Sequence, residues 1–61
     1  MRTICVLIED TIDSYKVIKE IEKNFPCFSS YELKENGYVE VSILCRQEDA
    51  GAVEARLASL V

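Results

Sequence analysis

The sequence predicts an α+β fold with two layers, in which a three-stranded, antiparallel-type sheet carries two helices on one face. Three observations support this prediction. Apolar and polar side chains alternate along residues 38–45, and β-branched residues dominate 2–8. Two other stretches repeat apolar residues every three or four positions, as helices do. An Asn36-Gly37 pair between β-rich runs indicates a hairpin. The predicted order is β-α-β-β-α.

The first half of the chain supplies one strand and one helix. The strand is the apolar run RTICVLI at 2–8. Acidic side chains at Glu9, Asp10 and Asp13 then bracket the start of a helix, where they complement the helix dipole. Pro26 ends this helix because the residue before a proline disfavours helical geometry. The positions at helical spacing are Ser14, Val17, Ile18, Ile21 and Phe25.

The second half supplies two strands and a second helix. The strand at 27–34 is more polar than the strand at 38–45. From about residue 47 the spacing is helical again, although Gly51 within it costs about 1 kcal/mol relative to alanine. No linker or repeat interrupts the chain, so we expect one domain over residues 1–61. The helical positions are Ala50, Val53, Leu57 and Leu60.

The length of the hairpin loop decides which side chains share a face. A two-residue loop would place Lys34 opposite Val39 and thus put charge beside the core. A three-residue loop at 35–37, with Gly37 left-handed in a bulge, gives a consistently apolar face instead. That register pairs Leu33 with Val39, Tyr31 with Val41, Ser29 with Ile43 and Cys27 with Cys45.

The strand order follows from connection rules. A right-handed crossover makes the first strand parallel to the second, and the third strand, which is the most apolar candidate for the middle, takes that position. The predicted order is 1-3-2, a ferredoxin-like arrangement that lacks its fourth strand, with the first strand as an apolar edge. The predicted core is Ile4, Val6, Ile8, Val17, Ile18, Ile21, Val41, Ile43, Val53 and Leu57.

This predicted architecture resembles that of small ferredoxin-like regulatory domains of the ACT type over nearly the whole chain. Such a resemblance implies a regulatory domain that binds a small ligand at a dimer interface. The turn EDTID at 9–13 lacks the glycine that those domains typically place there for ligand binding. The resemblance therefore concerns architecture and transfers no ligand site.

Composition narrows the classes of partner. Eleven acidic and seven basic side chains give a net charge of −4, and the basic residues form no cluster. We therefore expect no binding to nucleic acid and none to an anionic membrane surface. The apolar run at the start is too short for a signal peptide or a membrane span. Three cysteines, an odd number, lie in apolar runs, which favours the reducing cytoplasm.

Catalytic chemistry has few candidate residues. The chain contains no histidine, which removes Ser-His and Cys-His pairs and the HExxH zinc motif. The acidic group of Glu9, Asp10 and Asp13 could bind Mg²⁺ or act as a carboxylate pair, but helix capping explains it better. We therefore expect a protein that is not an enzyme, with no catalytic residues, no metal and no cofactor.

The three cysteines could in principle hold a metal, because thiolates suit zinc. No Cys-x-x-Cys spacing is present, however, and the predicted register directs Cys27 and Cys45 inward and Cys5 outward. Buried, inert thiols are therefore the favoured interpretation. An oxidisable pair of Cys27 and Cys45 remains the alternative.

The sheet face away from the helices is more apolar than a solvated face should be. We expect a non-catalytic protein-interaction or regulatory module that acts through this face and the first strand's edge, most simply as a homodimer. One alternative is the ACT-like ligand-binding domain. Another is an acidic inhibitor or adaptor, like some phage-encoded proteins, that docks on a basic partner. The candidate interface residues are Thr3, Cys5, Leu7, Phe28, Tyr38 and Leu44.

Overall fold

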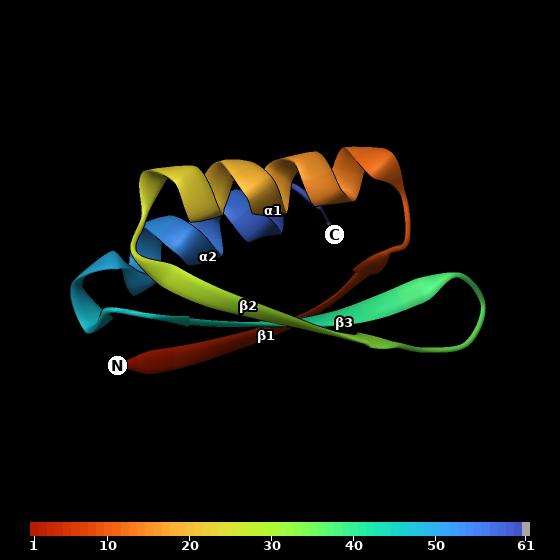
Figure 1. Cartoon of the computed structure of the whole chain (residues 1–61), viewed down its shortest axis with the longest axis horizontal. Helices are drawn as coiled ribbons and strands as arrows, with labels where there is room; N and C mark the ends of the chain where they lie inside the picture. The colour runs from red at the N-terminus through yellow and green to blue at the C-terminus, as the bar shows by residue number, and fades with distance from the viewer. Residues whose placement is uncertain (61) are drawn as a thin grey trace.

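The computed structural model describes residues 1–60 and has the predicted order of elements (Figure 1). The elements are β1 (Arg2–Glu9), α1 (Ile12–Asn24), β2 (Cys27–Leu33), β3 (Tyr38–Cys45), a 3-10 turn η1 (Gln47–Asp49) and α2 (Ala50–Ala58). The strands form one sheet in the order β1-β3-β2. Both neighbouring pairs are antiparallel, so β1 and β2 run parallel to each other. The predicted fold class and strand order are confirmed.

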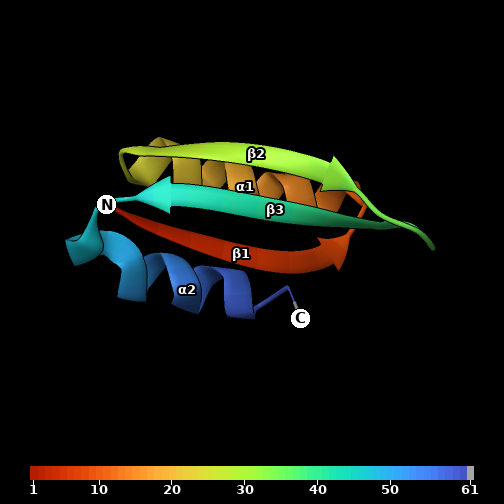
Figure 2. The same ribbon diagram turned by 90° about the horizontal axis from the view of Figure 1, so that it is seen from below.

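The helices form a layer on one face of the sheet (Figure 1). Seen through the sheet, α1 lies behind β2 and β3, whereas α2 lies beyond β1 at the edge of the sheet (Figure 2). The helix layer is therefore displaced toward the β1 side. Among residues 1–60 no helix covers the other face of the sheet, which we call the open face.

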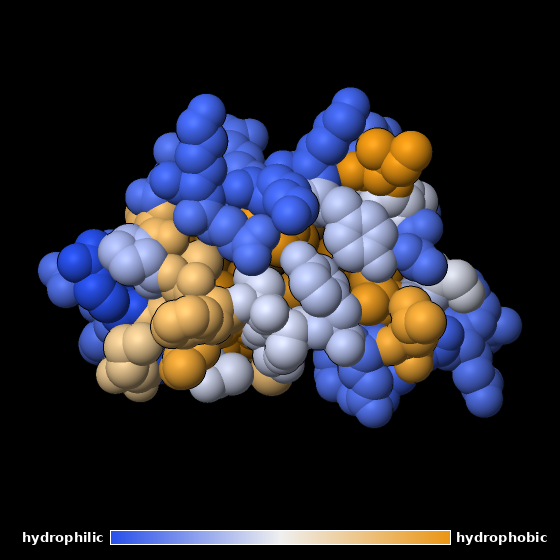
Figure 3. Space-filling view, viewed as in Figure 1, coloured by the Kyte–Doolittle hydropathy of each residue, from blue (hydrophilic) through white to orange (hydrophobic). Residues whose placement is uncertain are grey.

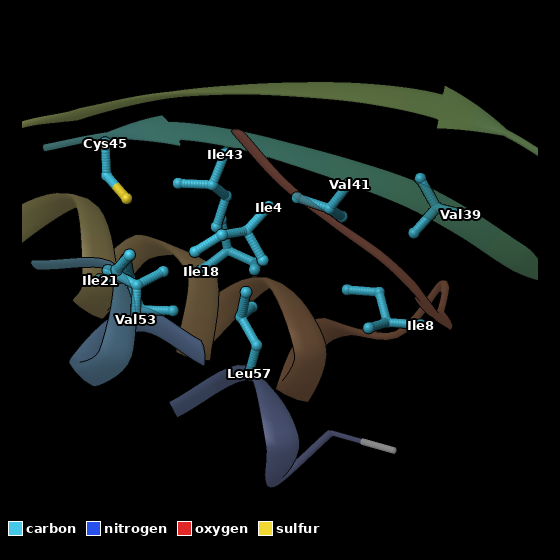
Figure 4. Packing of buried hydrophobic residues seen from close by; sticks show 11 residues of the cluster. Ile4, Ile8, Ile18, Ile21, Val39, Val41, Ile43, Cys45, Val53 and Leu57 are labelled. Carbon is cyan, nitrogen blue, oxygen red and sulfur yellow. The ribbon is translucent and has the colours of Figure 1, made fainter. Parts of the chain in front are cut away.

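The core lies between the sheet and the helices (Figure 4). Two predicted core residues, Val6 and Val17, are only half-buried. Val6 is on the edge strand, where β3 covers one side only, and Val17 lies to one side of the α1 face that carries Ile18. The buried apolar residues are Ile4, Ile8, Ile18, Ile21, Val39, Val41, Ile43, Cys45, Ala50, Val53 and Leu57.

The hairpin register that the alternation of side chains predicts is confirmed, with Leu33 opposite Val39 and Cys27 opposite Cys45. The turn differs in one detail. Asn36 as well as Gly37 has a positive φ, 60° and 76°, the combination that a two-residue type I′ turn requires.

The extra residue of the hairpin therefore lies between the end of β2 and the two-residue turn rather than in the turn itself. The Tyr38 amide donates to the Glu35 carbonyl at 3.3 Å, and the Lys34 amide donates to the Tyr38 carbonyl at 2.9 Å. Lys34 and Glu35 both face Tyr38, which is the arrangement of a β-bulge. The bulge shifts the register by one residue and keeps the charged side chains off the core face.

Candidate interaction surfaces

The side chains of the open face form rows across the three strands. Because residues opposite one another point to the same face, the two registers define each row from β1 through β3 to β2. The rows are Thr3–Leu44–Phe28, Cys5–Ser42–Ser30 and Leu7–Glu40–Glu32. One end of the open face is therefore apolar, the middle carries hydroxyl and thiol groups, and the next row is acidic.

The first of these rows, Thr3–Leu44–Phe28, is called the apolar row below. Phe28 leaves 74% of its surface exposed, and Leu44 leaves 36%. A hollow of about 310 Å³ lies beside the ring, which leaves room for a large side chain. Its lining residues are Thr3, Phe28, Ser29, Ser30, Ser42 and Leu44. The apolar row thus combines a projecting aromatic ring with an adjacent hollow.

The six predicted interface residues do not form one continuous patch. Thr3, Phe28 and Leu44 lie together in the apolar row, but the Cys5 row separates them from Leu7. In that middle row the Cys5 thiol is 3.4 Å from the Ser42 hydroxyl, so the two groups hydrogen bond. The sequence prediction placed all six residues on the open face without resolving this division.

The remaining candidates lie among acidic side chains. Leu7 is 51% exposed and stands in the row of Glu40 and Glu32. Tyr38, 40% exposed, pairs with Glu9 at the end of β1. The ammonium of Lys34 is 3.2 Å from the Glu32 carboxylate, and both side chains are exposed. This end of the open face is therefore acidic rather than apolar.

A groove runs along the outer edge of β1, beneath α2. It has a volume of about 430 Å³, and its lining residues are Thr3, Ile4, Cys5, Val6, Glu54, Leu57 and Ala58. The Arg2 guanidinium forms an ion pair with the Glu54 carboxylate at 2.9 Å, beside the Thr3 end of the groove. We call this the β1–α2 groove. Sequence reasoning identified the β1 edge but missed the groove, because the groove depends on how far α2 is displaced from the sheet.

A second group of exposed apolar side chains lies along α1 and β2. Ile12 and Leu33 are 76% and 75% exposed, and the rings of Tyr15 and Tyr31 pack at 5.7 Å between centroids. Weakly polar and apolar side chains gather over this side in Figure 3. The Tyr15 hydroxyl donates to the Asp10 carboxylate at 2.7 Å, a bond that raises the pKa of Tyr15. The sequence prediction placed Leu33 and Tyr31 on the apolar face of the hairpin and named none of these four residues as a surface.

The acidic residues near the helix starts do not cap the helices with their side chains, so the predicted capping role is wrong. The cap of α1 is Thr11, whose hydroxyl accepts from the Ser14 amide at 3.2 Å, so the neighbouring acids do not supply the cap. At the other end of the sheet, Arg46 binds the Asp49 carboxylate at 2.8 Å and lies 3.7 Å from that of Glu48. Within residues 1–60 no acidic or thiol side chains cluster in a way that could hold a metal ion.

The three thiols differ in their access to solvent. Cys5 is exposed on the open face, Cys27 is half-buried and Cys45 is fully buried. The predicted directions agree with this order, but the expectation of buried thiols is wrong for Cys5. Burial raises the pKa of the Cys27 thiol, and nearby Glu22 adds to the effect. All three are free thiols.

A thiol reagent at pH 8 should therefore modify the cysteines in the order Cys5, Cys27, Cys45. The thiolate is the reacting species, so exposure favours Cys5 and the raised pKa slows Cys27. Cys45 should react only when the core opens. Mass spectrometry of peptides along a time course measures the order. Modification of Cys45 as fast as Cys5 would contradict the burial described here.

Neither helix within residues 1–60 has the length and apolar character needed to cross a membrane. No protein-family model matches this chain, and neither a curated protein nor a solved structure matches it.

Proposed function

We propose that this chain is a non-catalytic protein-interaction module that forms a homodimer through the apolar row of its open face. The observation that carries the proposal is the exposed Phe28 ring beside a hollow lined by its own row. In a two-fold dimer the same patch of both subunits must be self-complementary. A surface that offers both a projecting ring and a hollow meets this requirement, since each Phe28 can enter the hollow of the partner.

Burial of the apolar row would also stabilise the fold. A chain of 61 residues can bury only about 60% of the surface of its unfolded form, so its core is small. Association that binds only the folded state adds to the free energy of unfolding by mass action. We place the module in a reducing compartment such as the cytoplasm, where free thiols persist.

A dimer through the β1 edge is the competing geometry, and α2 opposes it. The two-fold axis that pairs two antiparallel β1 strands is perpendicular to the sheet, so both α2 helices would lie on one face. Paired strands are about 4.8 Å apart, whereas packed helix axes need about 8–10 Å. Because α2 already lies beyond β1 (Figure 2), the two copies would overlap. The open face is free of this conflict.

Charge gives the dimer a distinctive response to salt. Each subunit carries a net charge of −4, so the two subunits repel each other, and salt screens that repulsion. Dimerisation through the apolar row should therefore strengthen as ionic strength rises.

The acidic row of Glu40 and Glu32 favours a second candidate function, an adaptor that docks on a basic protein surface. Binding of that kind should weaken as ionic strength rises.

Phe28→Ser should weaken the dimer at least about tenfold, the loss expected when more than about 1.4 kcal/mol of aromatic burial is removed. Analytical ultracentrifugation over a dilution series, at low and high salt, measures the dissociation constant. Leu33→Ser is the matched control, because Leu33 is equally exposed on β2 but does not point to the open face. A strict monomer at millimolar concentration, or equal weakening by both substitutions, would overturn the homodimer.

A further inference from the structure

The β1–α2 groove has the layout of a sheet that lacks one strand. β1 is an edge strand, so the backbone groups of every second residue point away from β3 and into the groove. On the helix side, α2 stands beyond β1 rather than above it (Figure 2). The space next to β1 is therefore bounded on one side by backbone groups that can hydrogen bond and on another side by α2.

The lining of the groove suits an extended chain. Ile4, Val6 and Leu57 contribute apolar surface, and the small side chain of Ala58 leaves space between α2 and β1. Arg2 and Glu54 neutralise each other near the start of β1. Past the groove, at the end of β1, Glu9 is exposed and makes no ion pair within residues 1–60. A strand that pairs with the whole of β1 would thus meet apolar side chains within the groove, a neutral ion pair near its start and an acidic side chain past its end.

We propose that the β1–α2 groove binds one extended segment of a partner protein, which pairs with β1 as a fourth strand. Backbone hydrogen bonds to β1 supply affinity, and alternating side chains supply specificity. The side chains that point toward α2 are apolar, and a basic residue beside Glu9 is favoured by charge. The open-face dimer is not required for this binding, since Phe28 and Leu44 do not line the groove.

The steric conflict at α2 excludes a second copy of this chain as the occupant. The β1 edge of a copy would bring its own α2 into the same space. A linear segment carries no helix above its backbone, so α2 can cover it. This difference commits the groove to a peptide-like segment rather than to the edge of this fold.

The test uses an eight-residue synthetic peptide in which valine alternates with threonine between terminal lysines. Amide hydrogen exchange of the Phe28→Ser variant is recorded by NMR with and without the peptide. Every second amide within 3–7 should exchange about tenfold more slowly when the peptide is at about ten times its dissociation constant. The same peptide with proline at its centre should give no protection, because proline cannot donate to the ladder.

A pair of α2 substitutions locates the binding site. Ala58→Trp should weaken peptide binding at least about tenfold, because the ring fills the groove and removes more than about 1.4 kcal/mol of binding free energy. Ala55→Trp is the matched control, since Ala55 is exposed on the same helix but does not line the groove. Circular dichroism checks that both variants fold. Unchanged β1 exchange at millimolar peptide, or equal effects of both substitutions, overturns the proposal.

Discussion

Ile21→Ala is expected to lower the free energy of unfolding by about 2–5 kcal/mol, the range for isoleucine or leucine truncation in a well-packed core. Ile21 is fully buried and lies with Ile18 and Val53 in the layer between sheet and helices (Figure 4). At roughly 0.05–0.15 kcal/mol per residue, a chain of 61 residues has only about 3–9 kcal/mol to lose, so the variant should be partly unfolded at 37 °C. Urea denaturation followed by circular dichroism measures the change.

Ile12→Ala on the same helix is the matched control for this prediction. Ile12 leaves 76% of its surface exposed, so its truncation removes little buried area and should cost less than about 0.5 kcal/mol. Leu57→Ala, from the opposite helix, should behave like Ile21→Ala because Leu57 is also buried. Similar denaturation midpoints for Ile12→Ala and Ile21→Ala would mean that α1 presents a different face to the sheet.

The hairpin register was predictable from sequence because side chains in a strand alternate with a period of two. Of the two loops compared, only the three-residue loop places Leu33 and Tyr31 on the face of Val39 and Val41, and the structure has that register. The conformation of the turn was less accessible. The predicted bulge was at Gly37, whereas the structure places the extra residue just after β2, at 34–35, and gives Asn36 a positive φ. The predicted bulge and the observed one give the same pairing of residues between the two strands.

The candidate sites were predictable only where they depend on strand faces. The apolar row follows from alternation and register, so Phe28 and Leu44 could be assigned to the open face. The β1–α2 groove depends on where α2 packs relative to β1, and periodicity identifies the buried face of a helix but not its lateral position. The same limit explains why Val6 was predicted to be buried and is half-buried, beside the groove.

Sequence patterns also failed to predict that apolar side chains of α1 and β2 are exposed, and this failure has a physical reason. Leu33 points to the helix-covered face, as its pairing with Val39 requires, yet it is 75% exposed. The inward direction of a side chain does not ensure a helix above it. Tyr31 likewise points inward and is 45% exposed at the sheet edge. Sequence patterns therefore predicted which face of the sheet each side chain points to better than whether a helix covers that side chain.

The two glycines should respond to substitution with opposite signs. Gly37 has a φ of +76°, and an added Cβ would meet no atom within 4 Å, so the cost of a side chain there is in the backbone alone. Gly37→Val should destabilise by about 1–3 kcal/mol, because β-branched residues are strained in the left-handed region. Gly37→Asn should cost less, since asparagine tolerates that region.

Gly51→Ala should instead stabilise the protein by less than about 1 kcal/mol, the difference between the two residues in a helix interior, because Gly51 lies in the first turn of α2. Gly51 lies in α2, has no positive φ, and an added Cβ would meet nothing within 4 Å. Chemical denaturation of all three glycine variants at one protein concentration compares them directly. An unchanged midpoint for Gly37→Val would contradict the turn described here. The Gly37 carbonyl also accepts from the Asp10 amide at 2.8 Å, so distortion of the turn would loosen the start of α1 as well.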